Sequence, residues 1–264
     1  MTKQLITLTT ICCLALTPTT SRAAQVILGA SKDASIFQEV PDNGSGAGNG
    51  LFTGGNNNAN PRRALVAFDV AGNLPTGATI QSVELTLTMA MAPGGSSGNR
   101  TVELRPVSVD WGEDSTLFAS PSGNSVGGQG AGAAAAPGDV TWNSRFHNSA
   151  PTTPWMPAGG AFAGAASASA SIAPTANVSY TWGSTPAMVS DVQGWLTTPS
   201  SNNGWLLFNP AETTAITFRA FYSRNVDNAM LRPKLTITYV PEPAGLLLAA
   251  LACTMALAKR VRRA

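Results

Sequence analysis

The sequence predicts an all-β protein, a jelly-roll-like antiparallel β-sandwich with one short helix and long Gly/Ala-rich loops, flanked by N- and C-terminal targeting helices. Two observations on the body of the chain support this fold class. Several segments alternate apolar and polar residues with a period of two, which is typical of half-buried strands. Turn-forming residues separate these segments, since the 264 residues include 26 Gly and 18 Pro.

The first 23 residues, MTKQLITLTTICCLALTPTTSRA, have the features of a secretory signal peptide. Lys3 precedes an apolar run that ends at Leu16, and small side chains occupy the positions that a signal peptidase reads. Ala23 and Ala24 flank the predicted cut. The segment is therefore excluded from fold reasoning, and we expect the rest of the chain to be exported.

The last residues, 240–264, read VPEPAGLLLAALACTMALAKRVRRA and combine a short apolar run with a basic end. The run, residues 244–258, has 15 residues; as a helix it would span about 23 Å, against about 30 Å for a hydrocarbon core. Four cations in the last six residues argue against a buried globular helix and would hold this end in the cytoplasm. The tail therefore predicts a short transmembrane segment, either a permanent or a transient anchor.

The body between these ends, residues 24–239, is expected to form one β domain. All three cysteines lie in the two ends, so the body has no disulfide framework and no cysteine-based metal site. Six of the 16 basic residues also lie in the ends, which leaves 10; against these stand 14 acidic residues if Glu242 is counted with the body, for a net charge of about −4. This balance removes the electrostatic basis for nucleic-acid binding.

Strands are predicted, in order, at residues 62–70, 79–91, 101–111, 204–209, 216–223 and 233–240. In the third, Pro106 marks a change of face, because proline cannot donate to a ladder and favours a bulge or an edge. The residues expected to point into the core are Ala64, Val66, Phe68, Val70, Val83, Leu85, Leu87, Met89, Met91, Val102 and Leu104, and, beyond Pro106, Val107, Val109 and Trp111.

One helix is predicted in STPAMVSDVQGWLTTP, with Ser184 or Thr185 as the cap and Pro186 in the first turn. Residues 120–139 and 157–177 are rich in Gly, Ala and Ser and are expected to be surface loops. Five tryptophans lie within motifs that favour packing: Trp111, Trp142, Trp182, Trp195 and Trp205.

Sugar binding usually combines an aromatic platform with polar or charged side chains. Trp155, between two prolines, is the candidate for an exposed platform, and Arg219, Tyr222 and Arg224 offer cations beside an aromatic ring. Because guanidinium groups pair well with carboxylates, these residues would suit an acidic polysaccharide. The alternative is that Tyr222 is a core residue and both arginines are solvated.

Calcium is the metal that the composition favours, because it binds carboxylate and carbonyl oxygens from loops. The candidates are Asp33, Asp42 and Asp227, and the alternative is ordinary loop capping by these side chains. Zinc is poorly supplied, with a single histidine, His147, and no exported cysteine.

Catalytic residues are sparse. A nucleophilic triad would depend on His147, and the motif of a nucleophile elbow is missing. The acidic run DWGED, with Asp110, Glu113 and Asp114, is more simply explained as a solvated turn than as a glycosidase pair. A polysaccharide hydrolase or lyase is therefore the least favoured reading.

The body resembles the DNRLRE-type domain, a secreted jelly-roll β-sandwich related to carbohydrate-binding modules. The similar segments follow one another through residues 24–239: KDASIF, GNGLFTGG, RRALVAFDV, LPTGATIQSVELTLTM, VDWGEDS, DVTWNSRF, TWGSTPAMVSDVQGWLTTPSSNNGWLLF and FYSRNVDNAMLRPKLTITY. The name-giving hexapeptide is not present. The resemblance implies a non-catalytic, carbohydrate-binding-like function, with structural calcium in some relatives.

The tail resembles the PEP-CTERM sorting signal of Gram-negative bacteria through Pro241, Glu242 and Pro243, the apolar run and the basic end. The resemblance implies recognition by an exosortase, cleavage near the triplet and delivery to the cell envelope, cell surface or exopolysaccharide matrix. The expected function is thus a secreted β-sandwich that interacts with polysaccharide, and the alternative is a purely structural surface or matrix protein without a specific ligand.

Overall fold

A computed structural model describes residues 22–113 and 123–242, so the predicted targeting helices lie outside the described residues. The strands are β1 (Ala24–Gly29), β2 (Lys32–Phe37), β3 (Asn43–Gly44), β4 (Gly50–Gly55), β5 (Pro61–Ala67), β6 (Thr79–Met91), β7 (Arg100–Pro106), β8 (Ala133–Ala134), β9 (Ser144–Phe146), β10 (Thr153–Pro154), β11 (Ala168–Ile172), β12 (Ser179–Trp182), β13 (Trp205–Phe208), β14 (Arg219–Tyr222) and β15 (Lys234–Val240). The helix α1 covers Pro186–Thr197, and a 3₁₀ turn, η1, covers Pro199–Ser201.

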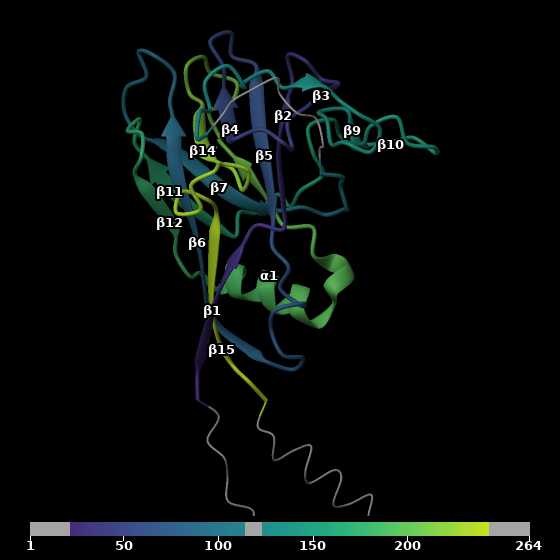
Figure 1. Cartoon of the computed structure of the whole chain (residues 1–264), viewed down its shortest axis with the longest axis vertical. Helices are drawn as coiled ribbons and strands as arrows, with labels where there is room; N and C mark the ends of the chain where they lie inside the picture. The colour runs from purple at the N-terminus through teal and green to yellow at the C-terminus, as the bar shows by residue number, and fades with distance from the viewer. Residues whose placement is uncertain (1–21, 114–122, 243–264) are drawn as a thin grey trace, which may run out of the picture.

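The predicted all-β fold is confirmed. Eleven strands form one antiparallel sheet in the order β1-β15-β6-β14-β4-β5-β13-β7-β11, with β12 also pairing β6 and β2 also pairing β5. This sheet curls on itself, so that β6 and β15 face β5, β7 and β13 across a shared apolar interior (Figure 1). Two short ladders, β3 with β8 and β9 with β10, stand outside it.

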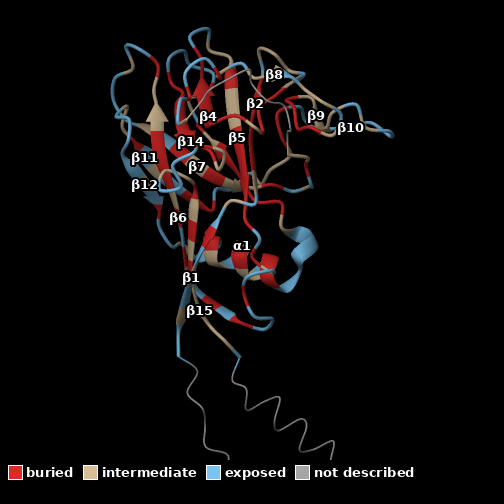
Figure 2. Cartoon of the chain, viewed as in Figure 1, coloured by how far each residue is buried: buried red, intermediate tan, exposed pale blue. Residues whose placement is uncertain are grey.

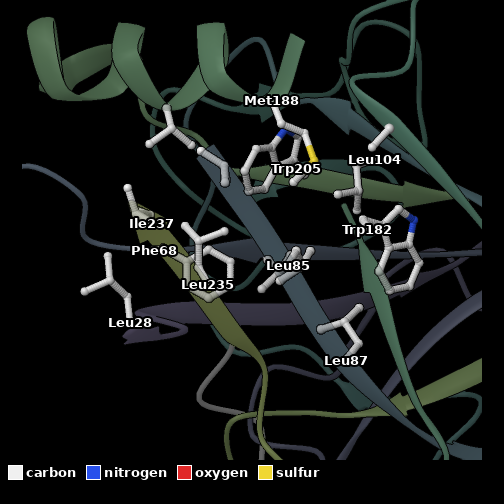
Figure 3. Packing of buried hydrophobic residues seen from close by; sticks show 14 of the residues in the cluster. Leu28, Phe68, Leu85, Leu87, Leu104, Trp182, Met188, Trp205, Leu235 and Ile237 are labelled. Atoms are coloured by element: carbon white, nitrogen blue, oxygen red, sulfur yellow. The ribbon is translucent and has the colours of Figure 1, made fainter. Parts of the chain in front are cut away.

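The main core lies between the two curled layers and contains the predicted inward rows of β5, β6 and β7, except Met91, which is half-buried and packs against another apolar cluster. Trp182, Leu85 and Leu87 pack there against Leu104 and Leu235 (Figure 3). Alternation places these side chains on one face, because successive residues of a strand point to opposite sides. The core is therefore built by the period-two pattern of the sequence.

Helix α1 closes one end of this interior. Thr185 is its N-cap, since the Thr185 hydroxyl accepts a hydrogen bond from the Met188 amide at 3.1 Å. Met188, Val192 and Trp195 follow at helical spacing and are buried; Met188 points toward Trp205 (Figure 3). The predicted helix is confirmed, together with the second of its two candidate caps.

A second core covers the outer face of β2, β5 and β13, which would otherwise be exposed to solvent. Leu65 and Leu206 point outward from the main core and pack under the segment between β7 and β11, which contributes Val107, Trp111 and Trp142. The change of face at Pro106 is confirmed, because Leu104 lies in the main core and Val107 in this one. Figure 2 colours β4 and most of β5 as buried.

The prediction that residues 157–177 form only a surface loop is wrong. Residues 168–172 form β11, which pairs antiparallel with β7 from Ala168 opposite Leu104 to Ile172 opposite Arg100. Ala168 and Ile172 are buried, while Ser169 and Ser171 are exposed. Small residues on both faces conceal this alternation in the sequence.

The two ends of the described chain lie side by side. β1 pairs with β15 from Ala24 opposite Tyr239 to Gly29 opposite Lys234, and both chain ends leave the fold at the same pole (Figure 1). The predicted cut sites at the two ends of the body are therefore neighbours in space.

Candidate functional site

The expectation that Trp155 is an exposed platform is wrong. Its side chain is 2% exposed, lies in the second core and donates a hydrogen bond from Nε1 to the Thr141 carbonyl at 2.9 Å. The flanking prolines suggested a free loop, but the small β9–β10 ladder folds that loop back onto the sheet. The other five tryptophans are buried as predicted.

Arg219 and Tyr222 lie in β14 and are both buried. The two faces of β14 pack differently, because Phe218, Ala220 and Tyr222 belong to a third apolar cluster while Phe221 belongs to the main core. Tyr222 donates its hydroxyl hydrogen to Asn177 at 2.9 Å. Neither reading of Arg219, as a surface sugar contact or as a solvated cation, agrees with its exposure of 0%.

Arg224 binds a carboxylate of the protein itself. Its Nε and Nη2 donate to the two oxygens of Glu113 at 2.6 and 2.5 Å, and its backbone N–H donates to Asp33 Oδ2 at 2.8 Å. The Asp33 amide in turn donates to Glu113 Oε1 at 3.0 Å. The predicted sugar contact of Arg224 is thus already occupied by an internal ion pair.

The Asp33 carboxyl is buried next to the Glu113–Arg224 ion pair. The side chain of Asp33 is fully buried, and Oδ1 has no hydrogen-bond partner among the described residues. Burial raises the pKa of the Asp33 carboxyl to about 7, the Arg224 amide opposes this shift, and the negative charge of Glu113 adds to it. Glu113 therefore takes the Arg224 guanidinium, and among the described residues the Asp33 carboxyl is bound only by the Arg224 backbone amide.

The predicted calcium ligands do not form one cluster. In residues 22–113 and 123–242, no group of three or more His, Cys, Asp or Glu side chains could hold a metal ion. Asp42 instead accepts a hydrogen bond from Asn143 at 3.0 Å, and Asp227 is exposed. The three aspartates do not fit a shared calcium site, and calcium itself stays a prediction.

A polar hollow of about 210 Å³ lies where the β9–β10 ladder meets the loop after β2. Its wall combines one carboxylate, one imidazole, one half-buried phenyl ring and several hydroxyl and amide groups. The lining residues are Asp42, Ser144, Phe146, His147, Asn148, Ser149, Thr152 and Thr153. This volume is below the roughly 300–1,000 Å³ of sites for drug-sized ligands, so it suits a small polar group.

The local sequence explains why these side chains converge. The Thr153 hydroxyl bonds both the amide and the carbonyl of Phe146, at 3.2 and 3.1 Å, and so fixes the ladder. The His147 amide and carbonyl are held by Asp139 and Gly138, each at 2.7 Å. Hydrogen bonds therefore hold the backbone of Phe146 and His147 in place beside the hollow.

The hollow does not contain a nucleophilic triad. Among the described residues the imidazole of His147 makes no hydrogen bond to a hydroxyl or a carboxylate, although Asp42 and Ser149 line the same wall. The Ser149 hydroxyl donates to the Pro151 carbonyl at 2.9 Å and also contacts the Thr153 hydroxyl. Of the lining residues, Asp42 was predicted from the sequence as a calcium ligand, and His147 was the histidine considered for zinc or a triad.

The acidic run after β7 is held by cations. Asp110 pairs with Lys32 at 2.8 Å, and Glu113 pairs with Arg224, while Asp114 lies outside the described residues. A second, open depression follows the outer side of α1, from Pro186 to Thr198. It contains no ionisable side chain, so the polar hollow is the stronger candidate.

The predicted processing residues lie at the shared pole. Ala24 begins β1, and Pro241 and Glu242 directly follow β15, whereas Pro243 lies outside the described residues. The Glu242 side chain rests against the turn at Gly77, where an added Cβ would meet it. No helix in the described part of the chain is long and apolar enough to cross a membrane, and residues 244–258 lie outside that part.

Comparisons with known proteins leave the family open. No family model matches the chain, and no curated protein shows significant similarity to it. The resemblance to DNRLRE domains and to PEP-CTERM signals therefore stays a prediction.

Proposed function

We propose that the chain is a secreted, non-catalytic β-sandwich protein that is sorted to the cell envelope or exopolysaccharide matrix and holds polysaccharide there. The observation that carries the proposal is the polar hollow beside the β9–β10 ladder. Hydroxyl, amide and carboxylate groups around a phenyl ring are the groups that hydrogen-bond sugar hydroxyls and contact the apolar face of a sugar ring.

Export and sorting are part of the proposal and rest on the two chain ends. A signal peptidase would act between Ala23 and Ala24, and an exosortase near Pro241, Glu242 and Pro243. The short apolar segment 244–258 would then be a transient anchor in the inner membrane. The juxtaposition of Ala24 and Tyr239 supports this, because both enzymes would meet the same pole of the fold.

A purely structural surface or matrix protein is the second candidate. The observation that favours it is the burial of all six tryptophans, which leaves no indole ring free as a stacking platform in the described chain. A spacer of this kind would keep the rigid two-core fold and bind nothing saturably.

These two candidates are separated by calorimetric titration. The full chain is titrated with the exopolysaccharide of the producing organism and then with a panel of other polysaccharides. We expect saturable binding that weakens at least tenfold in His147→Ala and Thr152→Ala, whose side chains line the hollow without any hydrogen bond among described residues. Met230→Ala, at a position 73% exposed, is the matched control. A folded chain that yields no heat with any polymer would favour the structural candidate.

A further inference from the structure

The interior of the sandwich ends in polar side chains at the pole away from α1. Arg100, Tyr180 and Arg219 each stand two residues from a core residue of the same strand, and therefore on the same face. These core residues are Val102 in β7, Trp182 in β12 and Phe221 in β14. Three inward rows thus change from apolar to polar at one place.

Arg219 binds only neutral acceptors. Its Nε donates to the Ile172 carbonyl at 3.3 Å, Nη1 donates to Ser96 Oγ at 3.0 Å and to the Phe218 carbonyl at 2.9 Å, and Nη2 donates to the Gly98 carbonyl at 2.8 Å. The side chain joins β14 to β11 and to the loop of residues 93–99. Its charge remains without a carboxylate among the described residues.

Arg100 lies directly beside this group, since it is the ladder partner of Ile172 and follows Gly98 by two residues. Within the described chain its side chain makes no hydrogen bond or ion pair, and its Nε is buried without a partner. The arginines that pair with carboxylates elsewhere in the fold are Arg62, Arg63, Arg105 and Arg224.

Two adjacent cations without an anion are unfavourable. Burial, together with the positive charge of Arg100, lowers the pKa of the Arg219 guanidinium to about 10. A buried charge that lacks a counter-charge carries a large desolvation penalty. An anionic oxygen group would offset that penalty and fill the donor capacity left at Arg100.

The loop of residues 93–99 leaves this place open to solvent. Gly94, Gly95 and Gly98 are exposed, and a Cβ added to any of them would meet no atom within 4 Å. Arg100 directly follows this loop and is only half-buried, so part of its side chain is open to solvent on the side of the loop.

We propose that Arg100 and Arg219 form an anion site that binds the carboxylate of a uronic acid residue in an acidic polysaccharide. Arg100 makes the direct contact, and Arg219 beneath it contributes charge and fixes the loop. The choice of a sugar carboxylate rests on the proposed function, whereas the need for an anion rests on the arginine pair. This site is distinct from the polar hollow.

The test uses the full chain and oligogalacturonate, with the fully methyl-esterified oligosaccharide as a neutral probe and sodium sulfate as an inorganic anion. Arg100→Gln is the variant, because it removes the charge and no hydrogen bond to a described residue. Arg145→Gln is the control, since among the described residues the Arg145 side chain donates only to the Asp110 carbonyl, outside this site. Urea unfolding followed by tryptophan fluorescence checks that both variants fold.

We expect the acidic oligosaccharide to bind at least tenfold more tightly than its ester, and Arg100→Gln to lose that preference while Arg145→Gln keeps it. Equal binding by Arg100→Gln and the wild type would overturn the site. If sulfate binds through Arg100 and the oligosaccharide does not, the sugar assignment fails. Loss of binding only in His147→Ala would leave the proposed function standing and reject this inference.

Discussion

Replacing Asp33 with asparagine should make the protein more stable at neutral and alkaline pH. In the folded chain the buried Asp33 carboxyl has a pKa of about 7, against an ordinary value of 3.8. The folded state therefore binds the proton more tightly than the unfolded state. Stability falls as the pH rises from about 4 to about 7 and levels off above that range.

The structure sets the size of this effect. Each pKa unit corresponds to about 1.4 kcal/mol, so the difference between 3.8 and about 7 corresponds to roughly 4 kcal/mol in the free energy of unfolding. Asparagine keeps the shape of the side chain but carries no charge. It can still accept the hydrogen bond from the Arg224 backbone amide, whose nitrogen lies 2.8 Å from Asp33 Oδ2. The advantage of Asp33→Asn over the wild type should therefore grow by roughly 3 kcal/mol between pH 4 and pH 8.

Urea unfolding at unit steps of pH, followed by the fluorescence of the buried tryptophans, measures this difference. Asp227→Asn is the control, because Asp227 is exposed, and its curve should stay parallel to that of the wild type. Parallel curves for Asp33→Asn and the wild type would refute the reasoning. They would mean that the Asp33 carboxylate is compensated in the folded chain, for example by a bound cation.

Three further substitutions test the packing around the two cores by urea unfolding. Glu212→Gln should cost about 3–5 kcal/mol, because it breaks a bidentate pair with Arg63 whose two side chains are 8% and 13% exposed; a loss below 1 kcal/mol would contradict this. Thr185→Ala should lower the free energy of unfolding by about 1 kcal/mol, because the helix cap is lost. Thr185→Ser, which keeps a capping hydroxyl, should retain most of the wild-type stability. Gly204→Ala should cost more than about 1 kcal/mol, since φ is +73° and the methyl group would meet the Val66 carbonyl; an unchanged midpoint would contradict this.

The period-two pattern was sufficient for the strands of the main core. Val83, Leu85 and Leu87 are inward as predicted, and the change of face at Pro106 is real. The strand β11 was missed because its residues are small, so its alternation carries almost no hydropathy contrast. Short-range patterns report which face of a strand is apolar, and they are weakest where alanine and serine alternate.

The candidate site was predicted less well than the fold. Trp155, Arg219 and Tyr222 were chosen for their chemistry, yet all three are buried by segments distant in the sequence. Exposure depends on what covers a face, and the outer layer over β5 and β13 comes from an insertion with little periodic signal. Asp42 and His147 line the same hollow although they lie far apart in the sequence, so no local spacing could predict that they come together.

The last strand of the body, β15, completes the layer that also contains β1 and β6. It lies between β1 and β6, so neither of these has its final neighbour until Val240 has been made. A chain synthesised from its N-terminus must therefore hold Leu28 and Val83 in an unfinished layer until synthesis is almost complete. Removal of everything beyond Val240 would leave that layer closed, whereas truncation only a few residues earlier would open it.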